Sequence, residues 1–156
     1  MTKTNAIRLI EQAQLTYRCT EYSYDEHDLS GLHAAASIGM PPEQVFKTLV
    51  ARGDKQRLFV FCIPVCCELD LKKAAKATGE KKIEMIHVKE LLPLTGYIRG
   101  GCSPIGMKKS YPTFMDETAI LYDEIAVSAG VRGQQLIMTP DDLINYAAMT
   151  LCDLTA

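Results

Sequence analysis

The sequence predicts an α/β (α+β) fold, a single domain with a mixed β-sheet surrounded by helices. A chain of 156 residues has the size of one domain. Helix and strand patterns follow one another without strict alternation, which argues against a doubly wound parallel sheet. Hydrophobic residues make up 47% of the chain, enough for a real core. No repeat, linker or low-complexity segment divides the chain, so the predicted domain covers residues 1–156.

The first third of the chain carries helix signals with clear ends and one strand between them. Residues 4–14 have a helical apolar stripe, and Thr4 can cap it. Residues 15–24 then alternate apolar and polar side chains, which predicts a strand. An alanine-rich helix follows and ends near Gly39, and Pro41-Pro42-Glu43 begins a short helical turn.

The middle of the chain predicts a hairpin followed by a helix. FKTLVA (46–51) and RLFVFCI (57–63) read as two strands, and RGDK between them has hairpin-turn chemistry. Residues 69–79 predict a helix with Asp70 near its start and Gly79 at its end.

The remaining elements are short. The pattern predicts a strand at 82–86, one or two helical turns at 88–96 limited by Pro93, strands at 124–130 and 134–139, and a helix at 139–148 that Thr139 caps.

Composition excludes several classes of protein. The net charge of −2 gives no global basic field, so a nucleic-acid partner would need a local patch. No apolar run approaches the roughly 20 residues that span a bilayer, and the first twelve residues lack the apolar centre of a signal peptide. We therefore expect a cytoplasmic protein with no membrane partner.

Cysteine and histidine spacing argues against a metal site. The six cysteines contain no CxxC pair and the three histidines are scattered. In a cytosolic chain, free buried thiols are expected, and the adjacent Cys66 and Cys67 are expected to fill the core.

Lys47 is the first candidate for chemistry. Strand alternation places it on one face with Leu49 and Ala51. If that face points inward, a partly desolvated lysine favours an anionic partner. The alternative is an edge strand on which the lysine blocks aggregation.

The stretch GGCSP, Gly100 to Pro104, is the second candidate. Glycines let the backbone approach a ligand closely, and successive N–H groups can hold an anion or an oxyanion. A tight turn would explain the same residues. Cys102 as a nucleophile would need an activating histidine, and none lies near it in the sequence.

Two further groups have ordinary explanations as well as functional ones. Ser128 and Arg132 lie in VSAGVRG, where a hairpin turn explains the glycines. A run of lysines can neutralise phosphates or simply form a solvated surface; its members are Lys72, Lys73, Lys76, Lys81, Lys82, Lys108 and Lys109.

Four segments in order carry a family resemblance. They are KTLV at Lys47, ELDLKKAAKATGEKKIEM at 68–85, TGYIRGGCSPIGMKK at 95–109 and VSAGVRG at 127–133. Together they resemble the YbaK/EbsC family, which belongs to the prolyl-tRNA-synthetase editing-domain homologues. The resemblance runs from about residue 4 to residue 153.

The resemblance implies a fold and an activity. The expected fold is a mixed, partly barrel-like sheet surrounded by helices. Members are free-standing trans-editing hydrolases, and the best-known branch deacylates Cys-tRNA(Pro), with Cys-tRNA(Cys) as a further substrate. The implied partners are the acceptor end of tRNA(Pro) and prolyl-tRNA synthetase. The resemblance implies no cofactor and no metal.

The resemblance also implies residue roles. The essential lysine falls on Lys47, which would contact the acceptor-end phosphate or ribose, and the substrate carbonyl would sit against the backbone of Gly100, Gly101 and Cys102. The pocket tyrosine falls on Tyr22, with Tyr24 as the alternative. The expected substrate-binding set is Tyr22, Thr48, Ser103, Pro104, Ser128, Arg132 and Gln135.

The chain departs from the family pattern at three places. Gln135 stands where one branch has aspartate, and Cys66-Cys67 stands where Gly-Asp is frequent. Residues 23–31 match poorly. These departures leave the preferred amino acid open more than the reaction.

The cysteine-specific branch is expected to need no enzyme nucleophile. The substrate's own thiolate attacks its ester and leaves as a cyclic thiolactone, so the enzyme only positions the thiol and stabilises the oxyanion. Three alternatives stay open: a deacylase for another small residue such as Ala-tRNA(Pro), a non-catalytic tRNA-binding module, and a thiol-redox protein that uses Cys66-Cys67 or Cys102.

Overall fold

The chain folds into five helices, two short 3-10 turns and eight strands among residues 2–156, the part that the computed structural model describes. The helices are α1 (Asn5–Gln12), α2 (Gly31–Ile38), α3 (Leu71–Thr78), α4 (Val88–Thr95) and α5 (Pro140–Tyr146), and the 3-10 turns are η1 (Pro42–Gln44) and η2 (Glu117–Leu121). The strands are β1 (Arg18–Glu21), β2 (Phe46–Gly53), β3 (Leu58–Pro64), β4 (Ile83–Met85), β5 (Thr113–Asp116), β6 (Ile125–Ser128), β7 (Gln134–Met138) and β8 (Thr150–Cys152).

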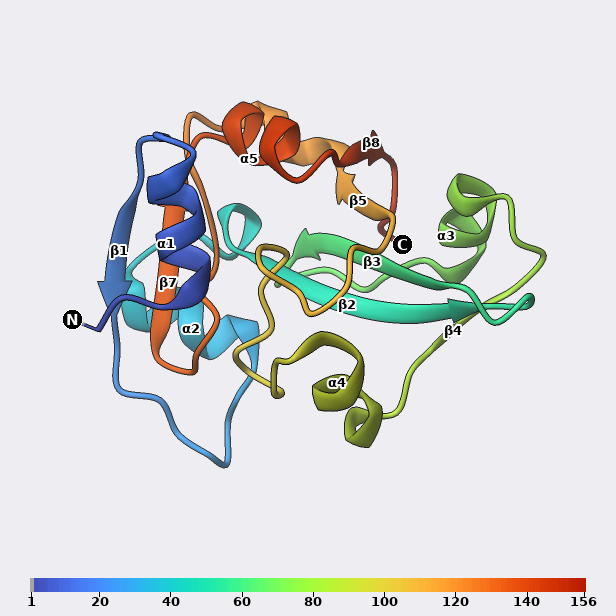
Figure 1. Ribbon diagram of the computed structural model, residues 1–156, viewed down its shortest axis with the longest axis horizontal. Coiled ribbons are helices and arrows are strands. Elements are labelled where there is room, and N and C mark those ends of the chain that lie inside the picture. Colours follow the sequence, from blue (N-terminus) through green and yellow to red (C-terminus); the bar gives the residue numbers. More distant parts are fainter. Residues whose placement is uncertain (1) are drawn as a thin grey trace.

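The strands form two open sheets. One has the order β1-β7-β6 and is antiparallel; the other has the order β4-β2-β3-β5-β8 and is mixed, with β5 parallel to both β3 and β8. An isolated parallel bridge between Val45 and Ala126 joins the sheets. The mixed α/β class is confirmed, but the expected partly barrel-like sheet is two sheets that do not close. Figure 1 shows the smaller sheet at one end of the molecule and the long β2–β3 pair extending toward the other.

Local signals placed most helices correctly. The Thr4 hydroxyl accepts from the N–H of Ile7 at 3.2 Å, as the predicted cap should. The Asp70 carboxylate caps α3 in the same way, and Gly39 and Gly79 end α2 and α3 in the left-handed conformation. The helix at 88–96 forms as α4 although Pro93 lies inside it.

Strand predictions were less complete. The hairpin is confirmed, with Lys47 opposite Ile63 and Arg52 opposite Leu58 in an antiparallel register. The strand expected at 15–24 is reduced to the four residues of β1. Strands β5 and β8 were not predicted at all.

Three clusters of buried side chains hold these layers together. The largest packs α1 and α5 against the two sheets around Ile10, Met115 and Leu136, and burial of such side chains is the main stabilising term in folding. A second cluster packs α3 on the β2–β3 pair around Phe61. A third fixes α2 against Val45 at the joint of the two sheets. Within residues 2–156, no helix combines the length and apolar character that crossing a membrane requires.

Candidate active site

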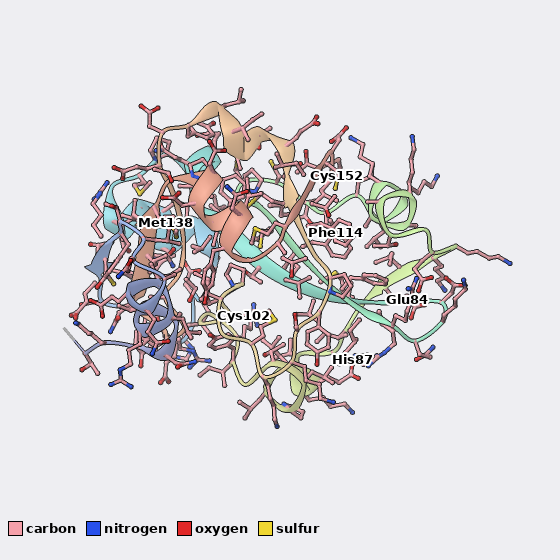
Figure 2. The ribbon with its side chains drawn as sticks, turned by 45° about the horizontal axis from the view of Figure 1, so that its top comes forward. Glu84, His87, Cys102, Phe114, Met138 and Cys152 are labelled. Atoms are coloured by element: carbon pink, nitrogen blue, oxygen red, sulfur yellow. The ribbon has the colours of Figure 1, made fainter. Side chains whose placement is uncertain are left out.

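A cavity of about 480 Å³ lies along one edge of β2. Its walls come from β2, the start of α2, the connection from β4 into α4, and the loop that follows α4. Figure 2 shows Cys102 and His87, both lining residues, on the side of the β2–β3 pair that carries α4. Seven of the eleven predicted site residues line this cavity: Tyr22, Lys47, Thr48, Gly100, Cys102, Ser128 and Gln135.

The cavity exists because β2 has a gap in its pairing. Strand β4 pairs only with Ala51–Gly53, and β6 reaches β2 only through the bridge at Val45. Between these points, residues 46–50 line the cavity. The N–H of Ile86 donates to the carbonyl of Val50 on this edge, so strand alternation turns the backbone groups of Thr48 toward the same edge. The cavity therefore offers a stretch of strand backbone to a ligand.

Lys47 lies on this stretch and is half-buried. Its ammonium has no ion-pair or hydrogen-bond partner among residues 2–156. A half-desolvated cation without a fixed counter-ion favours an anionic or strongly polar ligand. On this side, residues 46–50 of β2 have no partner strand, so Lys47 also lies on an unpaired strand edge, as the alternative interpretation expects. Lys47 therefore has both features: it lines a cavity and it lies on an edge.

Gly100 forms the opposite wall through a tight turn. The N–H of Gly101 donates to the carbonyl of Ile98 at 3.0 Å, and Gly100 has a φ of 86°, a pattern typical of a type II turn. A β-carbon on Gly101 would lie 3.1 Å from the backbone nitrogen of Arg132, so glycine permits the close approach of two loops. The tight turn and the backbone stretch predicted to hold a ligand are thus the same structure. The Gly101 N–H already donates to Ile98 within this turn.

Cys102 contributes backbone rather than thiolate chemistry to the cavity. Burial raises the pKa of its thiol to about 12, so the sulfur stays protonated at neutral pH. The N–H groups of Gly100 and Cys102 have no hydrogen-bond partner within the described part of the chain. These two groups, and not that of Gly101, are free to hold a carbonyl oxygen.

Four predicted site residues lie behind the cavity wall. Gly101 packs against the 131–133 loop, and Ser103 and Pro104 are buried. The Ser103 hydroxyl accepts from the N–H of Ile105 at 3.2 Å, which fixes the loop from inside. The Nε of Arg132 donates to the carbonyl of Arg99 at 2.9 Å, next to the cavity but outside its lining. The structure therefore does not bring these four residues into the pocket.

The floor of the cavity is polar. Ser128 and Gln135 are paired across β6 and β7, and both are more than nine-tenths buried. The Ser128 hydroxyl accepts from the N–H of Gly130 at 3.1 Å. The Oε1 of Gln135 has no hydrogen-bond partner within residues 2–156. An unpaired buried carbonyl costs free energy, so a ligand that donates to it is favoured.

Of the two tyrosines considered for the pocket, Tyr22 lines the cavity and Tyr24 does not. The ring of Tyr22 lies 6.4 Å from that of His33. Tyr24 is 46% exposed and packs beside Gly133, away from the lining.

Sequence reasoning missed three ionisable groups in the lining. Glu68 and Arg99 lie inside the segments that carried the family resemblance, but no pattern gave them a role. His87 reaches the cavity because it precedes α4, where its N–H donates to Glu90 Oε2 at 2.9 Å. His87 and Arg99 flank α4, which is linked to β2 by the ion pair of Arg52 with Glu90, and local sequence does not reveal this long-range contact.

The cysteines are free but not uniformly buried. The expectation that Cys66 and Cys67 fill the core is wrong, because Cys66 is exposed and Cys67 half-buried. Both lie in the turn after β3, with their sulfurs 3.8 Å apart.

Comparisons with known proteins identify a family. Residues 31–146 match the family of aminoacyl-tRNA editing domains. An Enterococcus faecalis protein, EbsC, named as a candidate Cys-tRNA(Pro)/Cys-tRNA(Cys) deacylase, is 47% identical over 153 residues, which cover 98% of this chain and 93% of that protein. A Bacillus subtilis protein of unassigned function, YwhH, is 25% identical over 73% of this chain and 72% of its own length.

Two solved structures share the fold. One, described as a candidate trans-editing enzyme for prolyl-tRNA synthetase, has a TM-score of 0.82 and 24% identity, and the match covers 99% of each chain. The other, the hypothetical protein APE2540, has a TM-score of 0.87 and 19% identity, and the match covers 96% of this chain and 97% of that one. At these identities the likeness concerns the fold alone.

Proposed function

The chain belongs to the aminoacyl-tRNA editing domain family, and we propose that it is a trans-editing deacylase that removes cysteine from Cys-tRNA(Pro). Cys-tRNA(Cys) is a second substrate, by analogy with the name of the EbsC relative. The enzyme acts on the acceptor end of the tRNA, in the cytoplasm, where its substrates are made. Selection of tRNA(Pro) falls to prolyl-tRNA synthetase as a partner.

One observation carries the mechanism: the pocket offers a cation and free N–H donors but no activated nucleophile. Lys47 is unpaired within residues 2–156, and the N–H groups of Gly100 and Cys102 are free there. The Cys102 sulfur is a neutral thiol because burial raises its pKa to about 12. Such a site suits a substrate that supplies its own nucleophile.

The substrate's thiolate is that nucleophile. It attacks its own ester carbonyl, a C–S bond forms, and the bond from the carbonyl carbon to the ribose oxygen breaks. The ribose oxygen takes up a proton, which balances the one that the thiol gave up to become the thiolate, and cysteine leaves as a cyclic thiolactone that water opens afterwards. The step on the tRNA is thus an intramolecular acyl substitution with the ribose oxygen as the leaving group, and after water opens the thiolactone the net result is hydrolysis of the ester.

The enzyme's residues position this step. The N–H groups of Gly100 and Cys102 hold the carbonyl oxygen as it becomes negative. The Lys47 ammonium stabilises the thiolate or the departing ribose oxygen. Holding thiol and carbonyl in contact supplies about 7–11 kcal/mol without any further group. Gln135 Oε1, the unpaired acceptor on the floor, accepts a hydrogen bond from the substrate's α-ammonium group.

A deacylase for alanine esters is the second candidate, because Glu68 and His87 both line the pocket. An alanine ester has no thiol and needs a water molecule activated by a base. A carboxylate or an imidazole in the lining can serve as that base.

Deacylation of Cys-tRNA(Pro) beside Ala-tRNA(Pro) tests the proposal. Wild-type protein should release cysteine only, and Lys47→Ala should abolish the release. Lys55→Ala, at the exposed tip of the same hairpin, is the matched control and should retain activity. Release of alanine would favour the base-activated water, and release of neither would favour a non-catalytic tRNA-binding module.

A further inference from the structure

The exposed cations around α4 have no fixed counter-ion among residues 2–156. Six of the seventeen lysines and arginines pair with carboxylates among residues 2–156. Four exposed ones around α4 have no carboxylate partner within residues 2–156; they are Lys89, Arg99, Lys108 and Lys109, and we call them the α4 rim.

The α4 rim is held on one structural unit. Lys89 lies in the first turn of α4. The N–H of Lys108 donates to the carbonyl of Thr95 at the end of α4, at 2.9 Å. The hydroxyl of Tyr111 donates to the carbonyl of Leu94 at 2.7 Å, so the loop carrying Lys108 returns along the helix.

The α4 rim is continuous with the pocket. Arg99 belongs both to the α4 rim and to the cavity lining. It precedes Gly100, which also lines the cavity and whose N–H has no hydrogen-bond partner within residues 2–156. A ligand anchored in the pocket therefore emerges beside these cations.

Local charge makes this surface positive although the whole chain has a net charge of −2. Residues 88–111 contain four basic side chains and one acid, Glu90. That acid is already neutralised, since its Oε1 lies 2.8 Å from the guanidinium of Arg52. The α4 rim thus has no internal counter-charge.

The other side of the mouth has the opposite sign. Asp25, Glu26 and Asp28 are exposed on the loop before α2. This loop reaches the same turn, because a β-carbon on Gly100 would lie 3.2 Å from Leu29 Cδ2. A polyanion that enters the pocket is repelled on the α2 side and attracted on the α4 side.

We propose that the α4 rim binds the phosphates of the tRNA acceptor arm while the 3′ end occupies the pocket. The inference rests on the proposed function and adds the direction from which the RNA approaches. Exposed lysines and arginines neutralise RNA phosphates and release counter-ions, so binding of this kind weakens as salt rises.

The lysines of α3 provide a matched comparison. Lys72 and Lys76 are also exposed and lack a carboxylate partner within the described residues. Figure 1 shows α3 on the other side of the β2–β3 pair from α4. These lysines have the same chemistry without the connection to the pocket.

Binding of an uncharged acceptor-stem minihelix that ends in CCA tests the proposal without turnover. Fluorescence anisotropy over a range of salt gives the slope of log K against log salt. Lys108→Ala/Lys109→Ala should lower the magnitude of this slope by about two, because each lysine that is removed neutralised one phosphate. Lys72→Ala/Lys76→Ala should leave it at the wild-type value. Equal slopes in all three proteins, or a larger drop in the α3 variant, would overturn the proposal.

Steady-state kinetics separates this inference from the proposed function. On Cys-tRNA(Pro), the Lys108→Ala/Lys109→Ala variant should raise KM by roughly tenfold at low salt and leave kcat near the wild-type value. On cysteinyl-adenosine, which lacks the arm, its KM should match the wild type. A wild-type protein that cleaves neither substrate contradicts the deacylase function, while the anisotropy still decides where RNA binds. An equal rise in KM on both substrates would contradict the α4 rim as an RNA surface.

Discussion

Ser128 and Gln135 face each other across the β6–β7 pair at the floor of the pocket, and both are more than nine-tenths buried. The Ser128 hydroxyl is used by the N–H of Gly130, whereas the Oε1 of Gln135 has no partner within residues 2–156. The pair therefore leaves one unpaired acceptor on a residue that lines the cavity. A carboxylate at this position would add a negative charge to the pocket that Lys47 lines.

Replacing Gln135 with leucine should separate function from stability. The substitution removes the unpaired carbonyl at similar volume, so the free energy of unfolding should rise by about 1 kcal/mol. The activity should fall, because the substrate's ammonium loses its acceptor, and kcat/KM should drop about 10- to 100-fold. Urea unfolding and deacylation of Cys-tRNA(Pro) measure the two effects. Gln134→Leu, one residue away and outside the lining, is the control; equal decreases in activity would show that the effect is not specific to the floor.

Replacing Cys102 with serine should leave most of kcat. The thiol is protonated up to high pH, since burial raises its pKa to about 12, and we therefore expect that it does not act as the nucleophile. The pH–rate profile of Cys102→Ser should follow that of the wild type between about pH 6 and 9. Iodoacetamide at neutral pH, followed by mass spectrometry, should label exposed Cys66 well before Cys102. Complete loss of activity in Cys102→Ser would contradict this account.

Alanine at Gly100 or at Gly101 should distort the backbone of residues 100–102, which is proposed to hold the substrate's carbonyl oxygen, for two different reasons. At Gly100, with a φ of 86°, alanine costs about 1–2 kcal/mol of backbone strain. At Gly101, the new β-carbon lies 3.1 Å from backbone atoms of Val131 and Arg132, so the two loops must separate. We expect both variants to lose activity, with lower melting temperatures. Gly39→Ala has similar strain at a φ of 72° but no atom within 4 Å, so it should lose stability and keep activity.

Replacing Glu90 with glutamine should loosen α4 in a pH-dependent way. The hydrogen bond from Arg52 lowers the pKa of the Glu90 carboxyl below its usual value. A carboxyl with a lowered folded pKa contributes stability above its unfolded pKa of about 4.3, and this contribution is lost as pH falls through the folded pKa. The melting temperature of Glu90→Gln should be lower than that of the wild type at neutral pH, and the difference should shrink below about pH 4.

The control for that experiment is Glu84→Gln, which breaks the exposed pair of Glu84 with Lys82. Exposed pairs contribute little to stability, so this variant should melt close to the wild type at either pH. A difference between Glu90→Gln and the wild type that persists unchanged at low pH would show that the ion pair is not its cause.

Sequence patterns predicted the elements whose signals are local. Thr4 and Asp70 cap their helices through side chains two or three residues from their partners, and Gly39 and Gly79 end helices by their own conformation. Strands β5 and β8 escaped prediction because they are short and pair in parallel with strands remote in sequence. Their stability comes from tertiary pairing, which no local pattern encodes.

The candidate site likewise contains residues that local patterns predicted and features that only tertiary contacts determine. Strand alternation and the glycine pattern pointed to Lys47 and to Gly100, and the structure places both in one cavity. Sequence could not show that the Gly101 N–H is used by Ile98, or that Arg132 lies behind the wall. It also could not place His87 in the lining, because that depends on the docking of α4. The roles of these residues in catalysis stay predictions.

Thiol dependence tests the central claim most directly. The measurement compares release of the amino acid from Cys-tRNA(Pro) with release from the same tRNA after methylation of the cysteine sulfur. The account predicts rapid cleavage of the first substrate, and cleavage of the second at the rate seen without enzyme, because the methylated sulfur cannot form the thiolactone. Similar enzymatic rates on both substrates would contradict it and would show that the pocket activates water instead.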